Sequence, residues 1–227
     1  MNINSRDIYS VGHSGFFDKI IFKKKLEILS VIKSIIDLKI VDSCLDIGTT
    51  NDINHQSSNS IIKNLPEISI LKSISDQKIN HPLFNLNLKK SITEDFTNDE
   101  ILKMSSDLVI SSATIEHVGN KKNQVKMIKN MINLSKKYFV ITTPNRFYPI
   151  DFHTKLPLIH WLPKNIHRIL LKIVGLKYYD REENLNLLSK NDLKKMMKNF
   201  DNKVDYKIKT INLLGIVSNF IIIGEIK

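Results

Sequence analysis

The stretch from Val41 to Asp52, VDSCLDIGTTND, constrains the fold more than any other part of the sequence. A short apolar run ends at Asp46-x-Gly48 and passes into small polar residues, as a buried parallel strand does where it runs into a loop. Gly48 allows a sharp turn and the close approach of a ligand, because glycine has no Cβ. Ligands of open α/β sheets bind beyond the carboxyl ends of the strands, so this loop is a candidate binding loop.

Two further stretches repeat this pattern. Asp107–Gly119, DLVISSATIEHVG, and Tyr138–Pro144, YFVITTP, both begin as apolar strands and then pass into small or turn-forming residues. Segments with apolar residues three or four positions apart lie between the strands, which indicates amphipathic helices. This alternation predicts an α/β fold with a mostly parallel sheet. The expected strands cover residues 41–47, 68–74, 83–88, 107–112 and 137–142, with an antiparallel pair over 206–213 and 219–223, and the expected helices cover 16–38, 60–65, 97–104, 121–136, 164–174 and 189–200.

The segments LDIGTTND, SSATIEHVGN, TTPNRFYPIDFHTKLPLIHWLP and EENLNLL resemble class I S-adenosylmethionine-dependent methyltransferases, and more narrowly a bacterial subgroup that acts on small molecules. The resemblance implies a Rossmann-like, mostly parallel seven-stranded sheet with helices on both faces and an antiparallel C-terminal strand. It also implies a methyltransferase domain over residues 41–227 with a cap insertion at about 145–188. Residues 1–40 are expected to form an N-terminal arm and a helix that packs on this core.

The same resemblance implies S-adenosyl-L-methionine as the cofactor, bound by the loops that follow the strands. In the family an acid after the second strand accepts the ribose hydroxyls; Asp76 is the acid here, although the usual position aligns with Ser75. The family often has a second acid after the third strand, where this chain has Asn87, Leu88 and Lys89. The implied cofactor contacts are Asp46, Gly48, Thr49, Asp76, Ser112, Ala113 and Glu116.

The pair Glu116-His117 follows the fourth strand. His117 is the candidate catalytic base for the acceptor, because an unperturbed imidazole titrates near neutrality. The alternative is that residues 114–118 simply begin a helix, with Glu116 favoured in the first turn and His117 solvated. Some relatives bind a divalent metal through an additional carboxylate three residues before this glutamate. Ala113 stands at that position, so no metal is expected.

The densest group of aromatic and histidine residues follows the fifth strand, in the segment that the resemblance identifies as the acceptor cap. Arg146 is one of four arginines in the chain, and its planar fork suits a carboxylate or phosphate on the acceptor. We expect it to face the same pocket as His117, because the two residues follow neighbouring strands. The alternative is that these side chains only pack a loop. The candidate acceptor contacts are Asn145, Arg146, Tyr148, His153 and Trp161.

The formal net charge of +11 raises the question of a nucleic-acid partner. Only four of the 34 basic residues are arginine, the better fork for phosphate and base edges, so nucleic acid is not expected to be the partner. A single cysteine, Cys44, lies inside an apolar strand, and no signal-peptide pattern is visible, which together predict a cytoplasmic protein. The longest apolar run, residues 211–223, is too short to span a bilayer.

The helix expected over residues 164–174 has an apolar stripe that includes Ile166, Ile169 and Ile173. We expect this stripe to pack on the domain; the alternative is peripheral contact with an anionic membrane. The predicted function is methyl transfer to an oxygen of a small or lipid-linked acceptor, with a saccharide suggested by analogy. One alternative is a non-catalytic cofactor- or ligand-binding protein that retains the fold, because the cofactor acids are sparse. Another is a nucleic-acid methyltransferase, which only the charge suggests.

Overall fold

The computed structural model describes residues 15–52 and 56–227, and its centre is a seven-stranded sheet with the strand order β3-β2-β1-β4-β5-β7-β6. The first five strands pair in parallel, and β7 runs antiparallel between β5 and β6. The fold class expected from the sequence is confirmed. The strands are β1 (Ser43–Ile47), β2 (Ile70–Ser75), β3 (Leu86–Lys89), β4 (Ser106–Ser112), β5 (Ser135–Pro144), β6 (Val204–Leu213) and β7 (Ile216–Ile226).

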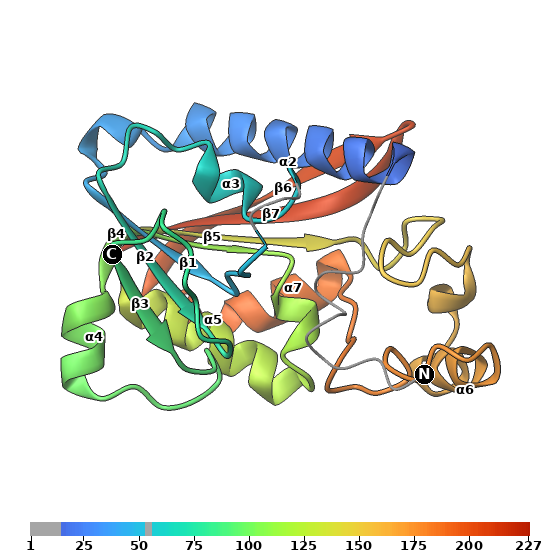
Figure 1. Ribbon diagram of the computed structural model, residues 1–227. Helices are drawn as coiled ribbons and strands as arrows, with labels where there is room; N and C mark the ends of the chain where they lie inside the picture. The colour runs from blue at the N-terminus through green and yellow to red at the C-terminus, as the bar shows by residue number, and fades with distance from the viewer. Residues whose placement is uncertain (1–14, 53–55) are drawn as a thin grey trace.

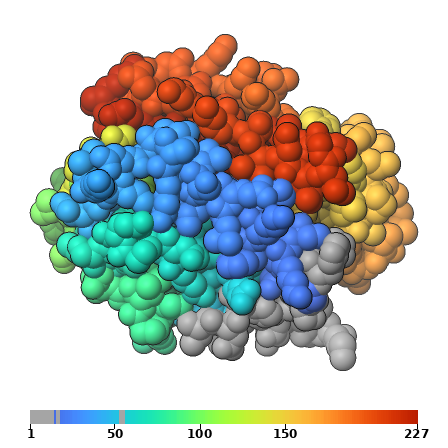
Figure 2. Space-filling view, turned by 90° about the horizontal axis from the view of Figure 1, so that it is seen from above, coloured from blue at the N-terminus to red at the C-terminus, as the bar shows by residue number. Residues whose placement is uncertain are grey.

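Helices cover both faces of this sheet (Figure 1). Neighbouring strand residues alternate between two apolar cores: Leu45 and Val109 lie in one, whereas Cys44 and Leu108 lie in the other. Figure 2 shows the face on which α2 lies between the β6–β7 hairpin and α3. The helices α2 (Phe16–Ile35) and α3 (Ser60–Lys63) belong to one face, and α4 (Asn98–Met104), α5 (Lys121–Leu134) and α7 (Lys190–Met197) to the other.

The strand order reverses between β1 and β4, so the loops after these two strands meet at the carboxyl edge of the sheet. Gly48 has a φ of +84°, a left-handed conformation that favours glycine. A Cβ on Gly48 would lie 2.3 Å from Oγ1 of Thr114, which belongs to the β4 loop. Glycine is therefore required both by the turn and by the close approach of the two loops.

The segment between β5 and α7 extends beyond the carboxyl end of the sheet, at the right of Figure 1. It leaves and rejoins the core at one place, because Asn145 and Leu188 form a parallel bridge and the Arg146 amide donates to the Leu188 carbonyl at 3.0 Å. It contains the 3-10 helix η3 (Ile159–Trp161) and α6 (Lys164–Ile173). We call residues 145–188 the cap.

The apolar stripe of α6 does not pack on the domain, so that expectation is wrong. Ile169 is 59% exposed and Ile173 is 73% exposed, whereas His167 and Leu171 on the other side of the helix are buried. The helix docks through this narrower side. No helix in residues 15–52 and 56–227 is long and apolar enough to cross a membrane.

Candidate active site

A cavity of about 470 Å³ lies at the carboxyl edge of the sheet, between the strand-end loops, α2 and the cap. Its position matches the reversal in strand order, where open α/β sheets bind their ligands. The structure brings together here most of the residues expected to bind the cofactor and two of the histidines. The lining includes Asp46, Gly48, Thr49, Asp76, Ser112, Ala113, His117 and His153.

Asp46 lies at the end of β1 and is only 7% exposed. Its Oδ2 accepts a hydrogen bond of 2.6 Å from Oγ1 of Thr49. Burial raises the pKa of Asp46 to about 6, because the carboxylate is removed from water and this one hydrogen bond compensates only in part. Lys25 of α2, which the sequence did not single out, also lines the cavity, and burial lowers the pKa of its ammonium group.

The end of β2 presents Asp76 to the same cavity, where its carboxylate is exposed. Ser75, which aligns with the acid of the family, is buried and donates from Oγ to the Thr49 carbonyl at 2.8 Å. Asn87 lies within β3, where its Oδ1 accepts a hydrogen bond from Ser73 of β2. Thr93 lines the cavity beyond β3 instead.

The loop after β4 contains one turn of 3-10 helix, η2 (Ile115–His117). Glu116 is completely buried; its Oε2 accepts a hydrogen bond of 2.9 Å from Thr143, and its Oε1 has no hydrogen-bond partner among the residues that the structure describes. Burial raises the pKa of this carboxyl group. Glu116 does not line the cavity, so the structure does not place it in contact with a cofactor there.

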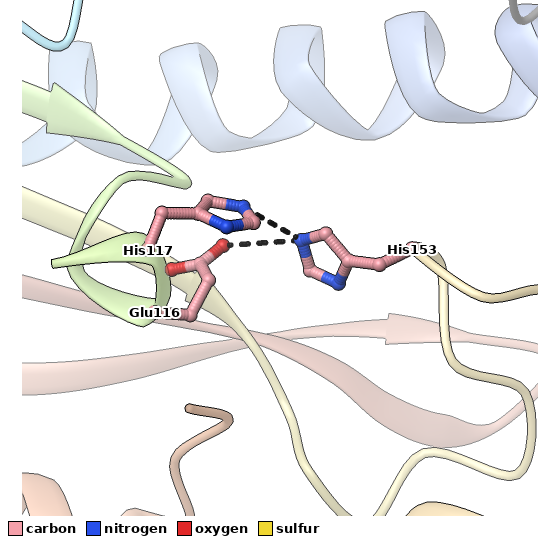
Figure 3. Close-up of side chains that lie close together, drawn as sticks. All are labelled: Glu116, His117 and His153. Carbon is pink, nitrogen blue, oxygen red and sulfur yellow. Dashed lines mark hydrogen bonds and ion pairs between the residues drawn. The ribbon is translucent and has the colours of Figure 1, made fainter. Parts of the chain in front are cut away.

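His117 points across the end of the cavity toward His153 of the cap (Figure 3). Its Nδ1 lies 2.7 Å from the Asn184 carbonyl, so we assign the proton to Nδ1 and leave Nε2 as an acceptor. The two Nε2 atoms of His117 and His153 are 3.1 Å apart. Burial, together with the charge of His153, lowers the pKa of His117 to about 3. This pKa lies below the near-neutral value of an unperturbed imidazole, and the contacts with Asn184 and His153 differ from a fully solvated side chain.

Asp151, which the sequence analysis did not single out, orients His153. Its Oδ1 lies 3.0 Å from Nδ1 of His153 and accepts a hydrogen bond from that nitrogen. Burial disfavours the charged imidazole, but the hydrogen bond to Asp151 and the charges of Asp151 and Glu116 outweigh it and raise the pKa of His153. The same contacts hold the pKa of Asp151 well below its usual range.

The motif EENLNLL, at the end of the cap, holds the η2 loop in place. The Asn186 amide donates to the Glu116 carbonyl at 2.7 Å, and Nδ2 of Asn186 donates to the Gly119 carbonyl at 2.8 Å. The Asn184 carbonyl fixes His117, as described above. This segment therefore positions Glu116 and His117 from the side of the cap.

Four of the candidate acceptor contacts do not line the cavity, and the expectation that Arg146 faces the same pocket as His117 is wrong. The Arg146 guanidinium donates to the His160 and Leu162 carbonyls at 3.1 and 2.8 Å, and so holds the cap together. The other three side chains also make contacts within the protein. Asn145 donates to the Val217 carbonyl, Trp161 donates to the Tyr148 carbonyl, and Tyr148 stacks on Phe152. The cap residues that do line the cavity are Phe152, His153, Tyr178, Tyr179 and Glu183.

Comparison with known proteins shows that this chain is similar in fold to solved structures. No family model and no curated protein matches the sequence. Among solved structures, magnesium protoporphyrin IX methyltransferase (ChlM) from Synechocystis PCC 6803 with bound SAH is 13% identical; the match covers 98% of this chain and 92% of that chain, with a TM-score of 0.56. The plantazolicin methyltransferase BpumL, in complex with a monoazolic desmethylPZN analog and SAH, is 14% identical, with coverage of 98% and 90% and a TM-score of 0.60.

A third structure, a cyclopropane-fatty-acyl-phospholipid synthase-like protein from Lactobacillus casei ATCC 334, is 9% identical; the match covers 92% of each chain, with a TM-score of 0.57. The structure thus has the fold of class I S-adenosylmethionine-dependent methyltransferases. In this chain that fold carries its cavity at the carboxyl edge, between the Asp46–Gly48 loop and the cap.

Proposed function

We propose that the protein transfers a methyl group from S-adenosyl-L-methionine to an oxygen of a small or lipid-linked acceptor, with a saccharide as the acceptor class. The observation that carries the proposal is the meeting of the Asp46–Gly48 loop with Ser112 and Ala113 at one cavity. Its volume of about 470 Å³ lies within the range of small-ligand sites. Gly48 lines this cavity and allows the β1 and β4 loops to approach closely there, and Asp76 offers an exposed carboxylate for hydroxyl groups.

The cofactor supplies an electrophilic methyl group, so the protein has to position the acceptor and remove water and a proton. The strand-end loops hold one end of the cavity, and the cap closes the other. His117 and His153 place two imidazoles at the end near the cap, where an acceptor hydroxyl would lie. Phe152, Tyr178 and Tyr179 give that end an aromatic wall with hydroxyl groups that suits a ring-shaped acceptor.

Cofactor binding gives a direct test. S-adenosyl-L-methionine at about a hundredfold excess over its dissociation constant should stabilise the fold by about 2.7 kcal/mol, a rise in melting temperature of roughly 5–10 °C. Replacing Asp76 by Asn should weaken binding measured by calorimetry, because it removes the exposed carboxylate at the cavity. Asp201→Asn is the matched control, since Asp201 is exposed and does not line the cavity.

A non-catalytic binding protein with the same fold is the second candidate. Two observations favour it: the Ser75 hydroxyl is already engaged by the Thr49 carbonyl, and the Lys25 ammonium group lies at the cavity wall. The absence of a melting shift and of calorimetric heat with both S-adenosylmethionine and S-adenosylhomocysteine would favour this candidate.

We propose a cytoplasmic location. The support is Cys44, which is buried and forms no disulfide.

The proposal of a lipid-linked acceptor includes contact between the cap and an anionic membrane surface. Three residues of the α6 stripe, Ile166, Ile169 and Ile173, are exposed, and Trp161 of the adjoining η3 is 44% exposed. The exposed lysines Lys155, Lys172 and Lys177 also lie in the cap. An exposed apolar stripe with tryptophan and lysine beside it is the composition of a helix that lies in a lipid interface.

Sedimentation with phosphatidylglycerol vesicles tests this contact. The protein should co-sediment at low salt and less at high salt, because part of the attraction is electrostatic. The double substitution Ile169→Glu and Ile173→Glu should remove the binding, whereas Leu102→Glu, which alters an 80% exposed leucine on α4, should not. Failure to bind at low salt, or equal binding by the double variant, would overturn the contact.

A further inference from the structure

Within the described part of the chain, three side chains present donor atoms to one point beside the cavity. They belong to Glu116, His117 and His153, whose ligand atoms all lie within 4.8 Å of one another (Figure 3). The two Nε2 atoms are 3.1 Å apart, and Nε2 of His153 is 3.7 Å from Oε1 of Glu116. Donors that bind one metal ion at about 2.0–2.2 Å lie roughly 3–3.5 Å from each other. The two histidines already have this spacing, and the Glu116 carboxylate would have to move closer to share the ion.

The surroundings orient each donor toward this point. His117 donates from Nδ1 to the Asn184 carbonyl, and His153 donates from Nδ1 to the Asp151 carboxylate, so both Nε2 atoms face inward. Outer partners of this kind, a carbonyl or a carboxylate on the second ring nitrogen, accompany most histidines that bind metal ions. Oε1 of Glu116 belongs to a fully buried carboxyl group and has no hydrogen-bond partner, which a ligand bond would supply.

We propose that Glu116, His117 and His153 bind a divalent transition-metal ion, with Zn²⁺ as the best match. Two imidazoles and one carboxylate suit zinc and its first-row neighbours better than Mg²⁺ or Ca²⁺, which prefer oxygen ligands. Three protein ligands leave a coordination position open. The sequence predicted no metal because Ala113 stands where some relatives have an additional carboxylate ligand. The third ligand comes instead from the cap, 36 residues beyond His117.

The role of the ion rests on the proposed methyl transfer, whereas its binding does not. His117 and His153 line the cavity, so the open position is accessible to an acceptor hydroxyl. Binding to the ion would lower the pKa of that hydroxyl, and its proton would pass to solvent. The acceptor oxygen would then attack the methyl carbon as the carbon–sulfur bond breaks, and the sulfur would keep the bonding electrons.

Titration of the EDTA-treated full-length protein with Zn²⁺, and with Co²⁺ as a spectroscopic probe, tests the binding in the absence of any methyl donor. We expect one ion per chain, a higher melting temperature and visible Co²⁺ absorption. Glu116→Gln keeps the shape of the side chain and its bond to Thr143 but should abolish these signals. Asp151→Asn leaves all three ligands in place and should weaken binding by about 10–100-fold, since it disturbs only the orientation of His153.

His81→Asn is the matched control, because His81 lies outside the group and asparagine can still accept from the Leu83 amide. It should bind as the wild type does. Absence of stoichiometric binding by the wild type, or equal binding by Glu116→Gln with an unchanged melting temperature in EDTA, would overturn the site. Cofactor binding measured in EDTA remains a separate result, so failure of the metal site and failure of the methyltransferase proposal can be told apart.

Discussion

Replacing His117 by alanine is expected to lower turnover about a hundredfold or more while the dissociation constant for S-adenosylmethionine stays unchanged. The imidazole lies at the end of the cavity near the cap, next to His153, whereas Asp46, Gly48 and Asp76, the residues proposed to bind the cofactor, line the cavity from the strand ends. The rate should show no inflection near pH 6.5 from this residue, because the pKa of His117 is about 3 and the ring is neutral throughout.

Turnover is measured as S-adenosylhomocysteine formed with the acceptor that the wild-type protein methylates, found by screening free and lipid-linked saccharides. Calorimetry with S-adenosylmethionine checks the cofactor end in the same preparation. His81→Asn serves again as the control for removal of a histidine elsewhere. A His117→Ala protein that methylates at the wild-type rate across the pH range would show that positioning by other residues is sufficient.

Replacing Asp46 by asparagine should change how stability depends on pH by about 3 kcal/mol. The folded state raises the pKa of Asp46 to about 6, so it binds this proton more tightly than the unfolded chain does. The contribution of Asp46 to the free energy of unfolding therefore falls as pH rises from about 4 to about 6. The asparagine side chain cannot ionise, so the Asp46→Asn variant should gain stability relative to the wild type over the same interval.

Urea unfolding at pH 4.5 and pH 7.5, without cofactor, should show about 2 kcal/mol of this difference, because the unfolded carboxyl group is already mostly ionised at pH 4.5. The other carboxyl groups titrate in both proteins, so their contributions cancel in the comparison. Asp201→Asn removes an exposed carboxyl group instead and should leave the pH dependence nearly unchanged. If the free energies of unfolding of the wild type and Asp46→Asn change in parallel with pH, then folding does not raise the pKa of Asp46.

Local signals in the sequence were sufficient to predict the fold and the loop after β1 that lines the cavity. The apolar run that ends in Asp46-x-Gly48 predicts both the strand and the turn after it, because the run and the glycine that the turn requires are only a few residues apart. The structure also has capping boxes at the starts of α4 and α7, where Thr97 and Ser189 each pair with an acid three residues later, so these helix starts too depend on neighbouring residues. Asp76 follows directly after a strand, so the topology alone brings it to the cavity.

The cap end of the site depends on contacts that no local pattern shows. The contact between His117 and His153 joins two loops across 36 residues and depends on how the cap folds back. Arg146 lies one residue after the bridge at Asn145, and only the positions of the His160 and Leu162 carbonyls show where its guanidinium points. For α6, periodicity marks an apolar stripe but does not show whether protein or something else covers it.

The cap leaves and rejoins the core at the bridge between Asn145 and Leu188, which lie side by side at the end of β5. An insertion whose two ends already meet can change in length at little entropic cost, because closing a longer loop adds only about 0.6 kcal/mol for each doubling. Residues 147–183 could therefore diverge, shorten or be exchanged between relatives while the sheet and its cofactor end stay as they are. In evolutionary terms, this junction allows the cap to change independently of the sheet and of the strand-end loops that line the cavity.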